Sequence, residues 1–483
     1  MRLAMVAHRL RRDLGDAAVI TDLTTRRTYE CDGLTSYRCT PGLVVLPEDA
    51  QGVRAAVLAC REAGVPFVAR GSGTGLSGGA LPEAAGVLIV TARMRRIIEV
   101  DLPNRRAVVE PGVVNLAVTG AVGPAGYFYA PDPSSQQICS IGGNVAENSG
   151  GAHCVKYGFT VHHVTGLEVC TPDGELRWLG PGKAARVPGY DLTGVFVGSE
   201  GTLGIATKIV VKLLRAPESV CTILAAFDSV ERAGAAVSAI IAAGIQPAAA
   251  EIMDALAIQA AEAAVSCGYP AGAQAVLIVE LDGPAVEVEA ETAAVTALCA
   301  EAFEVRAADD PARRAAIWKG RKSAFAAVGR ISRDYIVQDG VIPRTALAEV
   351  LREIDELAAS AGIRVANVFH AGDGNLHPLV LYDGQRQGAL ERAEKVSGAI
   401  LDLCVARGGS ITGEHGVGVD KSAKLPRMFS AEDLATMQLV RHAFDPDGRA
   451  NPGKVFPTPR LCAERSPAAL APRRSGERVR DAG

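Results

Sequence analysis

The sequence predicts an α+β protein, and two features of its 483 residues point to that class. Short apolar runs of strand length recur with helical segments across residues 40–217. An alanine-rich stretch at 219–305 then alternates strand and helix patterns, which favours an open sheet with helices on one face. At roughly 150 residues per domain, a chain of this length is expected to form two or three domains.

The elements of the first region follow from local patterns. The arginine-rich start, Met1 to Leu14, predicts a short amphipathic helix. A strand at Leu43–Leu46 is followed by a helix that Asp49 caps and Gly64 ends. A hairpin is predicted around Pro172-Asp173-Gly174, because these residues have turn chemistry. Further strands are predicted at 66–70, 87–90, 107–110 and 209–213.

The second region shows longer elements. Strands are predicted at 220–227 and 275–281, and a helix at 229–243 that stops at Gly244. A helix rich in Glu and Ala follows the second strand. From about residue 460 the chain is rich in Pro, Arg and Ser, which predicts a disordered tail.

Bulk composition excludes several classes of function. A net charge of -4 gives no electrostatic case for nucleic acid as a ligand. The 11 cysteines contain no C-x-x-C pair, so neither a zinc ribbon nor an iron–sulfur cluster is expected. No apolar run reaches the ~18 residues of a membrane span, and the N-terminus lacks a secretory pattern. We therefore expect a cytoplasmic protein that reaches a membrane only through partners.

A glycine loop at residues 70–79 predicts close contact between backbone amides and phosphate oxygens. Gly73, Gly75 and Gly78 match the spacing of the dinucleotide fingerprint of nicotinamide enzymes. That fingerprint must open a helix, and Ala80-Leu81-Pro82 cannot propagate one. The loop is therefore expected to connect two strands. A nicotinamide cofactor is not expected.

Other glycine-dense segments extend this prediction. They are Pro131-Asp132-Pro133-Ser134-Ser135, the runs at 140–144 and 148–151, and the run at 198–205. Several such segments within one domain favour an extended ligand buried along its length, which a dinucleotide satisfies better than an isolated phosphate.

Three histidines lie beside carboxylates in glycine-rich sequence further along the chain. His370 and His377 flank Ala-Gly-Asp-Gly-Asn-Leu, and Glu414-His415 stands between glycines. Two imidazoles and one carboxylate form a usable ligand set for a divalent transition metal, which leaves His415 for proton transfer. Asp373 and Asn375 are expected to shape the loop turns rather than to bind metal.

These motifs resemble those of the p-cresol methylhydroxylase/vanillyl-alcohol oxidase (PCMH/VAO) superfamily. The glycine loop is similar to the pyrophosphate loop of its FAD-binding domain, and residues 141–144 and 200–204 are similar to other flavin-contacting segments. The resemblance implies an N-terminal helical segment at 1–39 and a PCMH-type FAD-binding domain of two α+β subdomains at 40–217. It also implies a C-terminal FAD-linked oxidase domain at 218–457, with an antiparallel sheet covered by helices, and a disordered tail at 458–483.

Within the superfamily the chain resembles the D-2-hydroxyacid dehydrogenases, and among them the FAD-linked subunits of glycolate oxidases. The segments that carry this resemblance are 318–322 and 335–343. No histidine stands between His8 and His153, so the histidyl flavin linkage of some members is not expected and FAD should bind non-covalently. The resemblance implies cofactor contacts from Arg70, Gly71, Ser72, Gly73, Thr74, Gly75, Leu76, Pro131, Asp132, Ser135, Ile141, Gly142, Asn144, Asn148, Gly150, Gly151, Glu200, Gly201, Gly204, Ile205 and Asn451.

The resemblance also implies roles in catalysis. A divalent metal, with Zn²⁺ the first candidate, would be bound by His370, His377 and Glu414. His415 would take the hydroxyl proton of a 2-hydroxy acid, because an imidazole titrates near neutral pH. Arg321 would hold the substrate carboxylate, although an arginine on a helix also serves as a structural ion-pair partner. For Glu414 the alternative is likewise a structural ion pair, with an arginine as its partner.

The implied reaction is oxidation of a short 2-hydroxy acid, glycolate or D-lactate, with hydride passing to flavin. Relatives that oxidise longer diacids carry a lysine near the position of Val337, whereas Val337 and Gln338 are uncharged. D-2-hydroxyglutarate is therefore the alternative substrate. The chain has no cluster motif of its own, so electrons are expected to leave through companion flavin and iron–sulfur subunits or a quinone. A third hypothesis is that the chain is a flavin subunit that is inactive without its partners.

Overall fold

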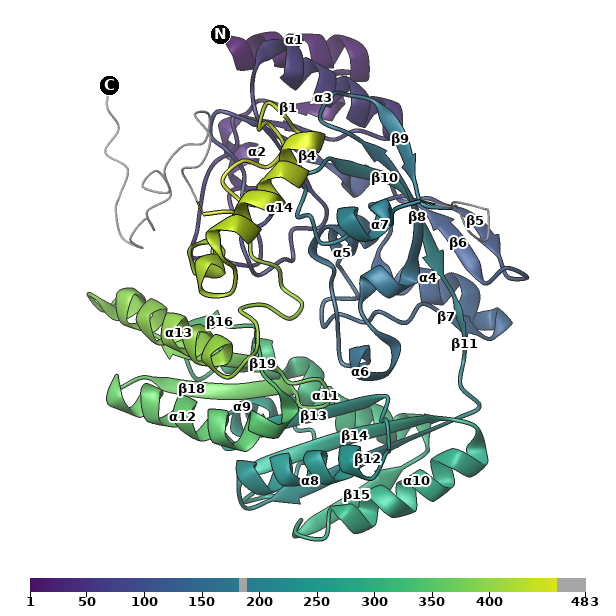
Figure 1. Ribbon diagram of the computed structural model, residues 1–483, viewed down its shortest axis with the longest axis vertical. Coiled ribbons are helices and arrows are strands. Elements are labelled where there is room, and N and C mark those ends of the chain that lie inside the picture. The colour runs from purple at the N-terminus through teal and green to yellow at the C-terminus, as the bar shows by residue number, and fades with distance from the viewer. Residues whose placement is uncertain (182–188, 458–483) are drawn as a thin grey trace. The chain divides into compact units, whose positions relative to one another are not determined.

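The chain folds into two compact units in a computed structural model that describes residues 1–181 and 189–457 (Figure 1). Unit 1 contains Met1–Gly151, Gly158–Ala216 and the described chain from Glu414 onwards. Unit 2 contains Ala152–Tyr157 and Pro217–Gly413. The predicted tail at 458–483 lies outside the described residues.

Unit 1 begins with a four-stranded sheet in the order β1-β2-β4-β3. Strands β2, β4 and β3 run parallel, and β1 pairs antiparallel with β2. As predicted, Asp49 caps α3 through the amide of Gly52, and Gly64 ends that helix in a left-handed conformation. The elements are α1 (Arg2–Leu14), β1 (Val19–Ile20), α2 (Leu23–Arg27), β2 (Leu43–Val45), α3 (Ala50–Ala63), β3 (Phe67–Arg70) and β4 (Val87–Val90).

A second sheet in unit 1 is antiparallel and has the order β5-β6-β10-β8-β9. The predicted hairpin joins β8 to β9, and Asp173 accepts the amide of Glu175 in its turn. Strand β5 was not predicted from the sequence. The elements are β5 (Ile97–Asp101), β6 (Arg106–Val109), α4 (Asn115–Val122), β7 (Tyr127–Phe128), α5 (Ile141–Glu147), β8 (Val164–Cys170), β9 (Leu176–Leu179), α7 (Leu192–Phe196), β10 (Ile205–Lys212) and β11 (Leu214–Arg215).

Unit 2 is built on an eight-stranded antiparallel sheet, β15-β12-β14-β13-β18-β19-β16, with β17 paired to β19. Its strands are β12 (Ser219–Phe227), β13 (Ala249–Asp254), β14 (Ala275–Gly283), β15 (Glu304–Ala308), β16 (Asp334–Val337), β17 (Gly340–Val341), β18 (Arg364–His370) and β19 (Asn375–Tyr382). Its helices are α6 (Cys154–Tyr157), α8 (Val230–Ala242), α9 (Ala255–Val265), α10 (Ala285–Leu298), α11 (Pro311–Val328), α12 (Leu347–Ser360) and α13 (Ala389–Ala406).

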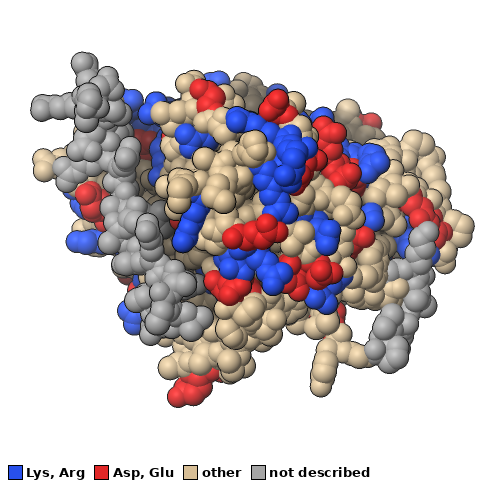
Figure 2. All heavy atoms as spheres, turned by 90° about the horizontal axis from the view of Figure 1, so that it is seen from above, with Lys and Arg blue, Asp and Glu red and all other residues tan. Residues whose placement is uncertain are grey.

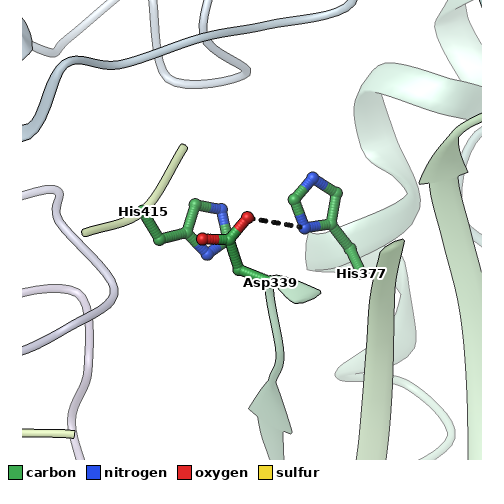
Figure 3. Close-up of side chains that lie close together, drawn as sticks. All are labelled: Asp339, His377 and His415. Carbon is green, nitrogen blue, oxygen red and sulfur yellow. Dashed lines mark ion pairs between the residues drawn. The ribbon is translucent and has the colours of Figure 1, made fainter. Parts of the chain in front are cut away.

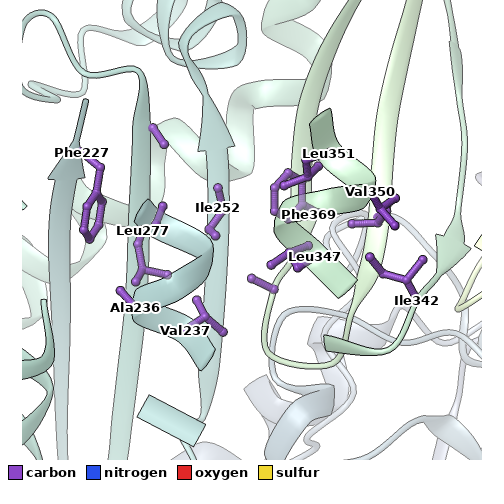
Figure 4. Close-up of a cluster of buried hydrophobic side chains, with 14 of the residues drawn as sticks. Phe227, Ala236, Val237, Ile252, Leu277, Ile342, Leu347, Val350, Leu351 and Phe369 are labelled. Atoms are coloured by element: carbon purple, nitrogen blue, oxygen red, sulfur yellow. The ribbon is translucent and has the colours of Figure 1, made fainter. Parts of the chain in front are cut away.

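One face of this sheet packs on α8, α10, α12 and α13 to form the main core of unit 2. Phe227, Leu277, Ile252 and Phe369 point from the strands into this core (Figure 4). Each large apolar side chain that is fully buried contributes roughly 1.5–3 kcal/mol. The helix Leu347–Ser360 supplies residues at helical spacing, including Leu347, Val350, Leu351 and Ile354.

The opposite face of the sheet is covered by α9 and α11, so the expectation of helices on one face only is wrong. The reason lies in the strands, which place Glu251 and Glu280 on this second face. Trp318 and Arg321 of α11 donate to those two carboxylates. Buried charges need such partners, and a helix provides them.

The last described segment packs with unit 1. After α14 (Ala431–Phe444), the amide of Phe67 donates to Arg449 O and that of Asn451 donates to Phe67 O. No helix within residues 1–181 and 189–457 has both the length and the apolar character needed to cross a bilayer. Basic and acidic side chains are intermixed on the face seen in Figure 2.

Candidate functional site

Two of the predicted metal ligands, His370 and His377, lie on one face of the sheet of unit 2. His370 is the last residue of β18 and pairs with Asn375, while His377 of β19 pairs with Val368. The two histidines are therefore diagonal neighbours, with ring centroids 5.0 Å apart. Although the surrounding sequence is rich in glycine, both histidines lie in strands, because only residues 371–374 form the turn, and both side chains are buried.

His370 is oriented by a carboxylate that the sequence analysis missed. Glu251 of β13 stands opposite His370, and its Oε1 lies 2.7 Å from His370 Nδ1. An ionised carboxylate only accepts, so His370 carries its proton on Nδ1 and presents the Nε2 lone pair. Burial alone would raise the pKa of Glu251, but the hydrogen bonds from His370 and Arg321 and the positive charge of Arg321 hold it below its usual value.

His377 is oriented in the same way by a backbone carbonyl. Its Nδ1 lies 3.2 Å from the carbonyl oxygen of Gln338, and 3.9 Å from Oδ1 of Asp339 (Figure 3). Phe325 of α11 packs edge-on against the ring, at 5.9 Å between centroids. Histidines that bind metals in proteins usually donate their second ring nitrogen to such an oxygen.

Arg321 lies in a fully buried ion pair. Its Nε is 2.8 Å and its Nη2 is 2.7 Å from Glu251 Oε2, and only 3% of its surface is exposed. The structure therefore brings Arg321 and His370 to the two oxygens of one carboxylate. The structural alternative for Arg321, a buried ion pair, is therefore present.

Glu414 and His415 follow directly after Gly413, the last residue of the main segment of unit 2. Gly413 donates its amide to the carbonyl oxygen of Asp339 at 3.0 Å and to Asp339 Oδ2 at 3.1 Å. Within unit 1, His415 Nε2 lies 3.8 Å from Glu414 Oε1. Both side chains are only partly exposed.

The turn that joins the two histidine strands behaves as predicted. Oδ1 of Asp373 accepts the amide of Asn375, and Gly374 has a positive φ of 81°. Asn375 is buried, and a Cβ added to Gly413 would clash with its amide. Glu251 and Asp339 were missed as site residues. The signal that could have revealed Glu251 is an acidic residue in the middle of an apolar strand.

The glycine loop of unit 1 connects β3 to β4, two parallel strands, and no helix follows it. This confirms the prediction that the loop runs from strand to strand. Gly71 lies against the start of α5, where an added Cβ would clash with Ser140 Oγ and lie 3.4 Å from the amide of Gly143. Gly75 is open, since an added Cβ there would meet nothing closer than Glu147 Oε1 at 3.9 Å.

Asn451 joins two of the predicted cofactor segments. Its Nδ2 donates to Gly79 O at 2.8 Å and to Glu200 O at 2.5 Å. Asn451, Glu200 and Asn148 have φ values of 43°, 50° and 52°, a left-handed conformation that few residues other than glycine adopt. Strain of this kind gathers at ligand-binding sites.

The segment at 131–132 is held against the glycines that follow α5. Asn115, which the sequence analysis missed, donates to Pro131 O and to Asn144 Oδ1 at 3.0 and 2.9 Å. An added Cβ on Gly151 would lie 2.5 Å from Asp132 O. All predicted cofactor-binding residues belong to unit 1. The close packing of backbone without side chains fits a cradle for an extended dinucleotide.

The carboxylates of buried Glu200 and half-buried Glu147 stand beside this cradle. Glu200 accepts the amides of Val417 and Gly418 at 2.6 and 2.7 Å. An added Cβ on Gly79 would lie 2.6 Å from Glu147 Oε1 and 3.3 Å from Glu200 Oε2. Burial raises the pKa of both groups, and for Glu147 the negative charge of Glu200 adds to that effect.

Comparison with known proteins supports the fold and the cofactor. Residues 41–180 match the model of an FAD binding domain, and residues 216–455 match that of the FAD linked oxidases, C-terminal domain. Glycolate oxidase subunit GlcD of Escherichia coli (strain K12) is 53% identical, over 90% of this chain and 88% of that protein. A D-lactate dehydrogenase of Anaerostipes hadrus is 32% identical, over 86% and 90%.

Among solved structures, p-cresol methylhydroxylase with substrate bound has a TM-score of 0.76 at 16% identity, covering 94% of this chain and 96% of that chain. An identity this low shows the fold alone. The PCMH-type fold predicted from the glycine-rich segments is confirmed, and so is the antiparallel, helix-covered sheet of the C-terminal half.

Proposed function

The chain belongs to the FAD-linked oxidases, and from that premise we propose that it oxidises glycolate or D-lactate to the corresponding 2-oxo acid. The proposal follows the curated relatives, one named a glycolate oxidase subunit and another a D-lactate dehydrogenase. Bound FAD, held non-covalently in unit 1, supplies a hydride acceptor at N5. Electrons then pass to a partner subunit or a quinone rather than to NAD.

The observation that carries the chemistry is the orientation of His370 and His377. Each Nδ1 faces an oxygen acceptor, so each neutral ring presents its Nε2 lone pair on the same face of the sheet. Two imidazoles held this way suit a divalent metal such as Zn²⁺. A bound divalent cation supplies a Lewis acid that lowers the pKa of the substrate hydroxyl.

Glu414 is proposed as the third ligand and His415 as the base that removes the hydroxyl proton. Both follow Gly413, and the amide of Gly413 is fixed by Asp339 beside His377. Arg321 binds the substrate carboxylate through its guanidinium, which Glu251 holds in one orientation.

The alternative substrate is D-2-hydroxyglutarate. Val337 of β16 is buried and Gln338 is uncharged, so neither provides a cation for a second carboxylate. This favours the short acids. The other alternative is a flavin subunit that works only within a complex, since the Escherichia coli relative is named as a subunit.

Anaerobic flavin reduction tests the proposal. Purified FAD- and metal-replete protein is mixed with glycolate, D-lactate or D-2-hydroxyglutarate, and flavin absorbance is followed with and without a chelator. We expect bleaching by one of the short acids that chelation abolishes. Faster bleaching by D-2-hydroxyglutarate would select the alternative substrate. No bleaching by any acid, and no turnover with an artificial electron acceptor, would favour the subunit that needs partners.

A further inference from the structure

Glu251 divides its two carboxylate oxygens between two residues of different proposed roles. Oε1 faces Nδ1 of His370 at 2.7 Å, and Oε2 accepts from Nε of Arg321 at 2.8 Å, with Nη2 of the same guanidinium 2.7 Å away in the ion pair. The side chain of Glu251 is completely buried. One carboxylate therefore touches both a proposed metal ligand and the proposed substrate-binding cation.

The backbone dictates this arrangement. Glu251 and His370 are direct partners in the antiparallel pairing of β13 with β18, so their side chains project from the same face. Arg321 reaches that face from α11, where it is buried and stacked near Phe325. None of the three side chains can leave this contact without exposing a buried charge to an apolar surrounding.

We propose that Glu251 is a positioning residue that couples the metal site to the carboxylate-binding site, an inference that rests on the proposed function. Through Oε1 it keeps the proton of His370 on Nδ1, so that Nε2 remains a ligand. Through Oε2 it holds the guanidinium of Arg321 at a fixed distance from that ligand. The spacing between a hydroxyl bound at the metal and a carboxylate bound at Arg321 is thereby set by one side chain, which favours α-hydroxy acids.

A glutamine at position 251 cannot do both tasks. Its amide has one acceptor oxygen and one donor group, whereas His370 Nδ1 and Arg321 both require an acceptor. If the oxygen faces Arg321, the amide donor faces His370 and moves the ring proton to Nε2, which blocks metal binding. If the oxygen faces His370, two donors meet and Arg321 is displaced.

The neighbouring strand offers a matched control. Glu280 of β14 lies on the same face and is also buried. Its Oε1 lies 3.0 Å from His153 Nε2, and its Oε2 accepts from Trp318 Nε1 at 2.7 Å, three residues before Arg321 in α11. Glu280→Gln therefore disturbs a similar arrangement, in which a carboxylate contacts a histidine and a residue of α11, without changing the proposed site.

The test measures Zn²⁺ affinity by titration of the metal-stripped, FAD-loaded full chain, alongside the melting temperature. We expect Glu251→Gln to weaken Zn²⁺ binding about 10–100-fold. Glu280→Gln should leave the affinity within about twofold, whatever it does to the melting temperature. Equal affinities for wild type and Glu251→Gln would overturn the inference. A wild-type protein that binds no Zn²⁺ would overturn the metal part of the proposed function, and the inference with it.

Arg321→Met separates coupling from simple loss of structure. Alone, it should retain Zn²⁺ binding and raise KM for the hydroxy acid more than it lowers kcat. Combined with Glu251→Gln, it removes the donor that competes for the amide oxygen, so Zn²⁺ affinity should return most of the way to the wild-type value. A double variant that binds Zn²⁺ no better than Glu251→Gln alone would contradict the coupling. Because the double variant is neutral at both positions, it should fold even if Glu251→Gln does not.

Discussion

Asp339 holds Gly413 through two acceptors, because the amide of Gly413 donates to the carbonyl oxygen of Asp339 at 3.0 Å and to its Oδ2 at 3.1 Å. The same Oδ2 accepts the hydroxyl of Thr412 at 2.6 Å. Asp339 is fully buried, and its Oδ1 lies 3.9 Å from His377 Nδ1. One side chain thus fixes the peptide that leads directly into Glu414 and His415.

Asp339→Ala should therefore slow catalysis without releasing the flavin. Loss of the carboxylate leaves the Gly413 amide with one acceptor and removes the hydrogen bond from the Thr412 hydroxyl, so the start of the 414–415 segment loosens. We expect the anaerobic rate of flavin reduction to fall by at least about tenfold, because small misplacements of reacting groups are costly. Stopped-flow absorbance measures the rate, and the visible spectrum measures bound FAD. A wild-type rate in a variant that retains FAD would contradict this role for Asp339.

Substitution of His377 tests the metal site directly. His377→Ala removes a ring whose Nδ1 is already engaged by Gln338 O, so metal stoichiometry should fall from about one per chain to near zero. Elemental analysis after dialysis measures the stoichiometry. His442→Ala is the control, because His442 is exposed on α14 of unit 1. Equal metal content in the two variants would exclude His377 as a ligand.

The sequence was sufficient for the parts of the structure that are locally encoded. Asp49 and Gly64 marked both ends of α3, and Pro172-Asp173-Gly174 marked the hairpin, because caps and turns depend on neighbouring residues. The sequence did not reveal the pairing of Glu251 with His370, which are 119 residues apart. Such a pair depends on strand order, which no local pattern encodes.

The same limit explains the other differences. The last described segment packs with unit 1 through Phe67 and Asn451. This packing depends on contacts between residues that are far apart in the chain. The glycine-rich segments could be predicted, because a cradle of backbone without side chains requires many glycines and these are visible in the sequence. A single polar residue such as Asn115, which hydrogen-bonds to both Pro131 and Asn144, is not marked by any such pattern.

A methyl group in the glycine loop should weaken FAD binding. Gly71→Ala would place a Cβ against Ser140 Oγ, at the N-cap of α5, and push the loop away from the helix. We expect the ratio of flavin to protein absorbance in the purified variant to fall severalfold. Gly120→Ala is the control, because an added Cβ in α4 meets nothing within 4 Å, and it should stabilise the protein by about 0.5–1 kcal/mol. A full complement of FAD in Gly71→Ala would show that the loop tolerates the displacement.

The carboxyl group of Glu147 should make the stability of the protein depend on pH. Its Oε2 is shielded from water and has no hydrogen-bond partner among the described residues. Burial first, and then the negative charges of Glu200 and Asp32, raise its pKa well above the usual value of 4.5, while Lys421 acts in the opposite direction. Below pH 4.5 the group is protonated in both the folded and the unfolded chain, so it has no effect on their difference. Above that pH the unfolded chain ionises first, and folding loses stability as the pH rises.

Glu147→Gln removes this loss, because the amide is neutral at every pH. At pH 7 the variant should exceed the wild type in free energy of unfolding by about 1 kcal/mol or more, and the difference should shrink toward zero as the pH falls to about 4.5. Urea denaturation of the FAD-loaded protein between pH 4.5 and 8 measures it. Glu175→Gln, at the exposed turn of the β8–β9 hairpin, should show no such trend. A difference between Glu147→Gln and wild type that stays constant over this range would mean that Glu147 is ionised in the folded protein, stabilised by Lys421 to a greater extent than its burial disfavours the charge.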